Sequence, residues 1–437
     1  MQPQIPRIRS PLDYVRPRVL RIGVTGLARS GKTVLLTSLA SSLLASNAVG
    51  GAIRSARLAP TGAATIPRFD QARHLAALAA DPPRWPERTD AVALLAIDLE
   101  LGTPSLPPRR LRLELLDYPG EWLLDLPLVA QSYEHWSADT LARLQQPALA
   151  PLARDFLAFC TGLPANAALD ESLAEAGHRL YRRLLERLRD EAGLSMLQPG
   201  RFLMPAPGAP PPWEMFFPAR GAGGLHRLLA RRYDAYVDAV RDGLVAPLFG
   251  DVDRLVVLAD LLSALQAGPL AFADVRASLS AAASALRWQG SWREALASLA
   301  KLRRPGRVIR RVAFIASKAD HVAERQRGNL AGLMRTMTGI AGGPKTAAFA
   351  VAAARCTEDF VWTLDGHPVS AVRGRVLGET TMTRSYPGEV PDRPPDAGFW
   401  THPFLTLPRF EPMRLHADRV PNLAIAELLG FLLEDVL

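Results

Sequence analysis

One stretch near the N-terminus constrains the fold of this chain more than any other. A strand-like run over 19–24 is followed by a glycine loop and by an apolar, helix-forming run over 33–44. The loop completes the pattern G-x-x-x-x-G-K-[ST], which is typical of a strand–loop–helix unit that binds phosphate. The residues that define the pattern are Gly26, Gly31, Lys32 and Thr33.

The residue types in this loop match the chemistry of a polyphosphate. Glycines let backbone N–H groups turn toward a β-phosphate, and the N-terminus of the following helix favours an anion. Lys32 adds a positive charge for the β- and γ-phosphates, and the Thr33 hydroxyl can ligate Mg²⁺. We therefore predict a nucleotide contact from Gly26, Arg29, Ser30, Gly31, Lys32, Thr33 and Val34.

A second nucleotide signal follows the loop. The runs 91–101 and 109–116 read as strands, and the proline-rich stretch between them suits a hairpin. The second run leads into Asp117-Tyr-Pro-Gly120, a D-x-x-G pattern at the end of a strand. We expect Asp117 to hold Mg²⁺ through water and the Gly120 N–H to reach a γ-phosphate. We expect the residues that follow, Trp122–Tyr133, to be mobile.

A third signal concerns the choice of base. A strand-like run over 308–317 ends in Ser317-Lys-Ala-Asp320, where GTP-binding folds carry [NT]-K-x-D. The aspartate of that motif accepts hydrogen bonds from guanine N1 and N2, and the lysine stem packs over the ring. Adenine lacks this donor pair, so a buried aspartate would be left unpaired at high cost. Ser317 departs from the usual Asn or Thr, although its hydroxyl can still bond the loop. We predict base contacts from Lys318, Asp320, Ala353 and Ala354, the alanines through a backbone N–H near guanine O6.

Composition restricts the other classes of function. At 437 residues the chain has the length of two or three domains, and its two cysteines, Cys160 and Cys356, suggest neither a disulfide framework nor a zinc site. The first residues hold no apolar signal core, and no apolar run reaches about 18 residues, so we expect no membrane span. The net charge of +9 permits contact with anionic membrane or nucleic acid but demands neither.

Changes in pattern divide the chain into successive parts. Helical periodicity over 137–250, with a proline-rich interruption at 204–218, indicates an insertion between the second and third signals. The arginines over 179–189 read as the solvated face of an amphipathic helix. We predict a loose arm over 1–18, the first part of a nucleotide-binding domain over 19–136, a helical insertion over 137–250, the second part of that domain over 251–356, a β-rich appendage over 357–420, and a helix packed on the core over 421–437.

Four motifs together carry a resemblance to a known family. Besides the phosphate loop they are Asp117-Tyr-Pro-Gly-Glu-Trp-Leu-Leu-Asp-Leu-Pro127, Ser317-Lys-Ala-Asp-His-Val322 and Tyr386-Pro-Gly-Glu-Val-Pro391. Over nearly its whole length the chain resembles the YcjX-type family of bacterial stress proteins. The resemblance implies an α/β fold, with a P-loop NTPase core of the Ras-like (TRAFAC) GTPase type, a mostly parallel sheet, a large helical insertion and a small β-rich C-terminal appendage. It also implies GTP binding and hydrolysis, an envelope-stress setting and a membrane-protein partner.

The stretch 48–88 is polar, punctuated by Gly and Pro, and long for a connection, which favours a functional loop. It contains a short helical pattern at 71–80. The family pattern W-P-x-x-T matches Trp85-Pro-Glu-Arg-Thr89 and supports Thr89 as a switch threonine that ligates Mg²⁺, with Thr65 as the alternative. The segments 48–89 and 120–135 would then be switches that a γ-phosphate orders.

The expected reaction is the hydrolysis of GTP to GDP and phosphate. Lys32, Mg²⁺ and the Gly120 amide would neutralise charge on the γ-phosphate. Where many GTPases carry glutamine after D-x-x-G, this chain has Glu121, and Arg29 is a candidate for a positive charge supplied in cis. We therefore expect slow intrinsic turnover. The residues assigned to catalysis are Lys32, Glu121 and Arg29, and those assigned to the metal are Thr33, Thr89 and Asp117.

Three other classes stay open. An ATPase of the same fold fits everything except the Ser317-Lys-Ala-Asp320 signal, and a nucleotide-binding scaffold without turnover is compatible with Glu121. A small-molecule kinase would need an acceptor site, for which the sequence shows no sign. As ligands we expect a guanine nucleotide and Mg²⁺, with no specific nucleic acid. We place the protein in the cytoplasm, with the surface of the inner membrane as the alternative.

Overall fold

The computed structural model describes most of the chain. It covers residues 18–45, 51–61, 66–86, 92–102, 108–120, 124–204, 210–245, 252–287, 309–339, 345–401, 406–416 and 419–437. The predicted N-terminal arm lies outside these residues, apart from Arg18, which begins the first strand.

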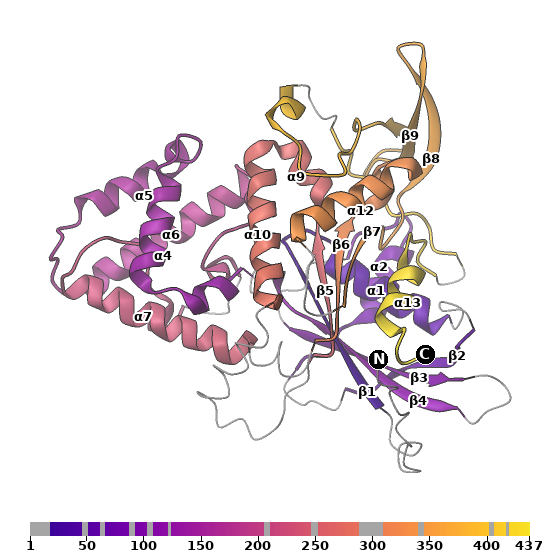
Figure 1. Cartoon of the computed structure of the whole chain (residues 1–437), viewed down its shortest axis with the longest axis horizontal. Coiled ribbons are helices and arrows are strands. Elements are labelled where there is room, and N and C mark those ends of the chain that lie inside the picture. Colours follow the sequence, from indigo (N-terminus) through magenta and orange to yellow (C-terminus); the bar gives the residue numbers. More distant parts are fainter. Residues whose placement is uncertain are drawn as a thin grey trace, which may run out of the picture.

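A seven-stranded sheet forms the centre of the molecule, in the order β2-β3-β4-β1-β5-β6-β7 (Figure 1). Only β3 runs against the other strands of this sheet, because it pairs antiparallel with both β2 and β4 while all the other pairs are parallel. The α/β class with a mostly parallel sheet is therefore confirmed. The strands are β1 (Arg18–Gly26), β2 (Ile53–Ala59), β3 (Ala93–Leu101), β4 (Arg109–Asp117), β5 (Arg254–Ala259), β6 (Arg311–Ser317) and β7 (Lys345–Val351).

In the antiparallel part of the sheet, the sequence predicts the hairpin of β3 and β4 but not the edge strand β2. The hairpin of β3 and β4 is present, with pairs running from Ala93↔Asp117 to Leu101↔Arg109. The sequence does not predict strand β2, because the stretch 48–88 reads as a connection. It is an edge strand whose middle residues are half-buried or exposed, so its sequence lacks the apolar run of a central strand.

One face of the sheet is covered by α1 (Lys32–Leu44) and α13 (Ile425–Leu433) (Figure 1). Their leucines share a hydrophobic core with Val256 and Leu258 of β5. Helix α13 lies within the C-terminal stretch where the sequence predicts a helix packed on the core. Helix α2 (Gln71–Ala79) lies beside α1, at the short helical pattern in the first predicted switch.

The other face is covered by α9 (Leu261–Ala267), α10 (Pro269–Arg287) and α12 (Glu324–Thr338). These helices share a second core with Leu255 and Val257 of β5. Successive residues of β5 thus enter different cores, as expected for a parallel strand that is buried on both faces.

Four helices form a lobe to one side of the sheet (Figure 1): α4 (Tyr133–Leu144), α5 (Ala150–Gly162), α6 (Glu171–Asp190) and α7 (Gly224–Val240). The lobe occupies the stretch for which the sequence predicts a helical insertion. Its core is rich in aromatic rings, and Trp136 of α4 stacks on Tyr233 of α7 with ring centroids 5.3 Å apart. Such pairs add stability beyond the area they bury. These rings belong to the same buried cluster as Leu255 and Val257 of β5, so the lobe shares one core with this face of the sheet.

A second sheet lies near the C-terminus of the chain, in the order β10-β9-β8. Its strands are β8 (Thr357–Leu364), β9 (His367–Arg375) and β10 (Met382–Ser385). The projecting hairpin of β8 and β9 turns at Asp365 and Gly366, both with positive φ, which is the backbone that an Asp-Gly turn favours (Figure 1). This sheet lies in the region that the sequence predicts to be a β-rich appendage.

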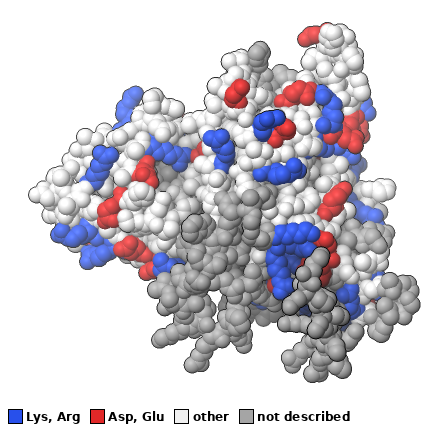
Figure 2. Space-filling view, viewed as in Figure 1, with Lys and Arg blue, Asp and Glu red and all other residues white. Residues whose placement is uncertain are grey.

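Charged side chains of both signs are mixed over the helical lobe (Figure 2). Along α6, Arg179 pairs with Glu175 and Arg187 pairs with Glu191, each one helical turn apart. Among the helices in the described ranges, none is long and apolar enough to cross a membrane.

Candidate nucleotide-binding site

The phosphate loop joins β1 to α1 at the carboxyl edge of the sheet, where open α/β sheets bind their ligands. A Cβ at Gly26 would come within 2.5 Å of the Leu258 carbonyl oxygen, so only glycine lets the loop leave the sheet here. Arg29 and Gly31 have left-handed backbone, with φ of 61° and 89°. Helix α1 then begins at Lys32, whose ammonium donates to the Gly26 oxygen at 3.4 Å.

The D-x-x-G motif lies directly beside this loop. Asp117 ends β4, pairs in register with Val24 of β1, and is 2% exposed. Gly120 touches the loop so closely that a Cβ would lie 1.7 Å from the Gly26 oxygen and 2.9 Å from Lys32 Nζ. Only glycine therefore fits between the end of β4 and the phosphate loop.

The predicted base motif follows β6. The Ser317 hydroxyl donates to the Ala259 oxygen at 3.2 Å and so bonds the end of the neighbouring strand. Lys318 has left-handed backbone, and its ammonium forms an ion pair with Asp260. Burial raises the pKa of Asp260, but the Lys318 ammonium and the hydrogen bonds from Ser263 together outweigh burial and hold the pKa below its ordinary value. Asp260 is therefore charged at neutral pH and fixes the end of the lysine side chain.

Asp320 is the most firmly held residue of this motif. It is 1% exposed, and its Oδ2 accepts from the Cys356 N–H at 2.7 Å and from the Cys356 thiol at 2.9 Å. The Thr357 hydroxyl donates to the Asp320 carbonyl oxygen. Burial, together with the nearby Asp320 charge, raises the pKa of the thiol well above its usual range, so the thiol stays protonated and able to donate. These bonds fix the orientation of the carboxylate.

The phosphate loop and the base motif line one cavity of about 1030 Å³. That is at the upper end of the volumes common for small-molecule sites, roughly 300–1,000 Å³. Of the predicted contact residues, the cavity brings together Arg29, Ser30, Gly31, Val34, Lys318, Asp320, Ala353 and Ala354. Gly26, Lys32, Thr33, Asp117 and Gly120 are not among its lining residues, while Thr65, Thr89 and Glu121 lie outside the described residues.

Three further walls of the cavity are not predicted from the sequence. They are α9, through Leu262, Ser263 and Gln266, the end of the helical lobe, through Arg189 and residues 193–195, and the C-terminal segment 407–410. The Trp85 indole N–H donates to the Phe410 oxygen at 3.0 Å and joins the first predicted switch to that segment. The W-P pattern indicated Trp85, but no sequence signal links it to a residue so far along the chain.

Comparison with known proteins decides the family. A family model described as "YcjX-like family, DUF463" matches residues 20–437. The chain belongs to the YcjX-like family. The resemblance inferred from the motifs is thus confirmed, and with it a fold of the P-loop NTPase type.

Two curated relatives of this YcjX-like protein carry the name Ras-like GTPase YcjX. The one from Escherichia coli (strain K12) is 31% identical over 458 residues, which cover 96% of this chain and 96% of the relative. The one from Shewanella oneidensis is 31% identical over 481 residues, which cover 98% and 97%. Both matches extend through the helical lobe and the C-terminal sheet, so the similarity is not confined to the phosphate loop.

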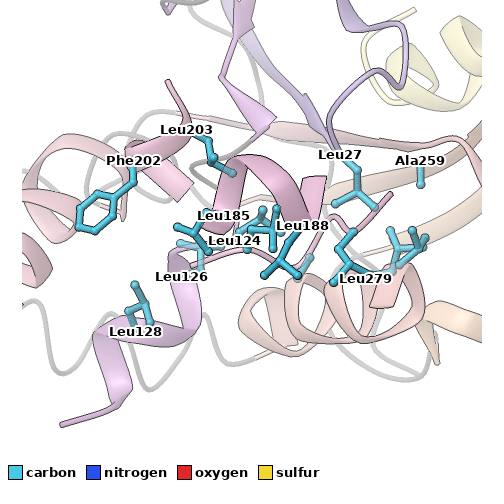
Figure 3. Close-up of a cluster of buried hydrophobic side chains, with 14 of the residues drawn as sticks. Leu27, Leu124, Leu126, Leu128, Leu185, Leu188, Phe202, Leu203, Ala259 and Leu279 are labelled. Atoms are coloured by element: carbon cyan, nitrogen blue, oxygen red, sulfur yellow. The ribbon is translucent and has the colours of Figure 1, made fainter. Parts of the chain in front are cut away.

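In this YcjX-like chain the segment after D-x-x-G packs into the core, unlike the mobile segment predicted over 122–133. Its described part includes Leu124 and the short helix η2 (Leu126–Ala130). Leu124 lies in one buried cluster with Leu185 and Leu188 of α6 (Figure 3). The prediction of mobility rests on the position after the motif. It gives too little weight to the leucine-rich run, because leucine is among the residues most often buried.

Asp125 ties the same segment to the helical lobe. Its buried carboxylate accepts from the Tyr236 hydroxyl of α7 at 2.6 Å and from the Gly200 N–H at 2.7 Å. Burial raises the pKa of Asp125 to about 6, although these hydrogen bonds act in the opposite direction. The residues that follow Gly120 are therefore connected to the lobe by direct polar contacts.

Replacing Asp125 with asparagine should remove a pH dependence of stability. The pKa of Asp125 is about 6 in the folded state and has its ordinary value of 3.8 in the unfolded state. Between these pH values the folded state binds more protons, so the free energy of unfolding falls as pH rises. The loss is about 2–3 kcal/mol between about pH 4 and pH 7, and Asp125→Asn should not show it because an amide does not titrate. Urea unfolding at both pH values measures the difference. Asp139→Asn, at a 62% exposed side chain on α4, is the control, and parallel slopes for Asp125→Asn and wild type would contradict the assignment.

Proposed function

We propose that this protein binds GTP with Mg²⁺, hydrolyses it to GDP and phosphate, and acts as a nucleotide-dependent switch. The observation that carries the proposal is a single cavity lined both by Gly31 of the phosphate loop and by Asp320 of the base motif. The loop predicted to hold polyphosphate and the motif predicted to read a purine thus line the same space. The names of the two curated relatives, Ras-like GTPase YcjX, support the same function.

Guanine is the base that the chemistry of the cavity favours. The Asp320 carboxylate is buried and held by the Cys356 N–H, so its acceptor oxygens have a fixed direction. The N1–H and N2–H of guanine would satisfy such an acceptor, whereas adenine would leave it unpaired. Lys318, anchored by Asp260, would pack its stem over the ring.

The proposed phosphate site combines one cation, Lys32, with oxygen ligands for Mg²⁺. Lys32 donates to the Gly26 oxygen, and an ammonium has three N–H donors, so it can also bind a phosphate oxygen. The Thr33 hydroxyl and the Asp117 carboxylate lie at the start of α1 and the end of β4, and both are hard oxygen donors of the kind that Mg²⁺ prefers. A Mg²⁺ ion bound there would neutralise charge on the β- and γ-phosphates. In this proposal Thr89 would be a further ligand of Mg²⁺, and Glu121 would take part in catalysis.

The position of Gly120 supports the proposed switching role. Its backbone rests on the phosphate loop, beside Lys32 Nζ, and the chain continues to Leu124 and Asp125 in contact with the helical lobe. A γ-phosphate bound by the Gly120 N–H would shift this segment, and hydrolysis would release it. From the resemblance to the family we also propose a role in bacterial envelope stress, with a membrane-protein partner.

Titration calorimetry with GDP, GTP, ADP and ATP in the presence of Mg²⁺ tests the proposal. We expect guanine nucleotides to bind at least about 100-fold more tightly than adenine nucleotides, because the buried aspartate discriminates by its hydrogen bonds. Phosphate release from GTP should accompany binding, at a slow rate. No binding at about millimolar GDP would end the proposal, tighter binding of ATP would favour an ATPase, and binding without phosphate release would favour a scaffold.

A further inference from the structure

The end of α6 forms part of the cavity wall. Arg189, the last arginine of this helix, lines the cavity together with Arg29, Ser30 and Gly31 of the phosphate loop. Its side chain is 24% exposed, against 56% for Arg179 earlier in the same helix. The sequence assigned both arginines to the solvated face, but the fold turns Arg189 toward the cavity.

The end of α6 and the phosphate loop contribute to one buried cluster. Leu185 and Leu188 are buried in the same hydrophobic cluster as Leu27, a residue of the loop itself (Figure 3). Leu188 directly precedes Arg189, so the backbone that carries the arginine is fixed by a buried side chain. The core therefore fixes the point on the cavity wall from which the Arg189 side chain starts.

Two arginines meet one aspartate at this wall. Arg189 donates through Nε and Nη2 to the two carboxylate oxygens of Asp190, both at 2.9 Å. Arg29 Nη2 lies 3.4 Å from Asp190 Oδ1. The Arg189 hydrogen bonds lower the pKa of Asp190, so this carboxylate is charged at neutral pH. Two guanidinium groups thus share one carboxylate beside the phosphate loop.

We propose that Arg189 binds the phosphate groups of the nucleotide, so that the helical lobe completes the site. This inference rests on the proposed function, because it takes the cavity to be the nucleotide site. A guanidinium carries five N–H donors in a plane and can therefore hold Asp190 and donate to phosphate oxygens at the same time. Asp190 is a positioning residue, because it orients Arg189 and ties it to Arg29 across the junction of lobe and loop. Bound nucleotide then joins the lobe to the sheet.

The test compares how fast a fluorescent GDP analogue leaves wild-type protein and Arg189→Gln. We expect release to be about tenfold faster from the variant, as for the loss of one charge-assisted contact to phosphate. Arg183→Gln, at an exposed arginine of the same helix, is the matched control and should release at the wild-type rate. Arg189→Lys should restore part of the difference, since it returns the charge without the planar donor pair.

Guanosine, which has no phosphate, separates a phosphate contact from a structural effect. In calorimetry Arg189→Gln should weaken the binding of GDP and leave the binding of guanosine unchanged. Equal weakening of both ligands, or a release rate equal to that of Arg183→Gln, would overturn the proposal for Arg189. If wild-type protein binds no GDP, the proposed function itself fails, so the two failures can be told apart.

Discussion

Replacing Lys32 with alanine should lower the rate of GTP hydrolysis by about 10²–10³-fold, the usual cost of removing a group that stabilises transition-state charge. Lys32 Nζ lies 3.4 Å from the Gly26 oxygen, and Gly120 packs beside it. The ammonium therefore sits where the phosphate loop meets the start of the second predicted switch. Alanine leaves no cation there to balance negative charge on the transferring phosphoryl group. Single-turnover phosphate release, with protein in excess over GTP, measures the effect.

Lys345→Ala is the matched control for this experiment. Lys345 lies at the start of β7, is exposed, and pairs with Glu434 of the C-terminal segment. It does not line the cavity, so its loss should leave hydrolysis unchanged. Thermal unfolding of both variants without nucleotide separates a loss of catalysis from a loss of fold. A Lys32→Ala protein that hydrolyses GTP at the wild-type rate would be incompatible with the proposed mechanism.

The parts that the sequence predicts well are those in which chemistry is encoded within a few neighbouring residues. The phosphate loop is one turn between a strand and a helix, and its glycines are required by the approach of the Leu258 carbonyl and by left-handed backbone. Strands β5 and β6 are buried on both faces and read as apolar runs. The local sequence is sufficient to predict such elements, because contacts with distant segments do not change the part that their residues play.

The parts that were missed depend on contacts between segments distant in sequence. In the sequence Arg189 cannot be told apart from the exposed arginines of the same helix. It lines the cavity only because α6 packs into the core through Leu188. Phe410 meets Trp85 because the C-terminal segment returns to the first predicted switch. Strand β2 is partly polar because it pairs on one edge only, so its apolar content is too low to mark it. In each case a tertiary contact decides the role of a residue.

Replacing Asp320 with asparagine should change the preferred base from guanine to xanthine. Asparagine keeps an acceptor oxygen but exchanges the second for an N–H donor, so the N2 amino group of guanine would face a donor. We expect GDP affinity to fall by at least about 10²-fold, because a buried donor pair without an acceptor is costly. Xanthosine diphosphate carries a carbonyl oxygen at that position and should bind the variant more tightly than it binds wild type. Calorimetry with both nucleotides measures the exchange.

The fold of the variant can be checked within the same experiment. Asp320 Oδ2 accepts from the Cys356 N–H, and the oxygen of asparagine can keep that bond, so Asp320→Asn should retain the local structure that Asp320→Ala would lose. ADP serves as the reference ligand, because its base offers no pattern that either side chain satisfies. If Asp320→Asn loses GDP and gains xanthosine diphosphate, then Asp320 reads the base directly, since a merely damaged pocket would weaken every nucleotide. An unchanged preference for GDP would instead mean that Asp320 serves only to hold Cys356 and that selectivity comes from another wall of the cavity.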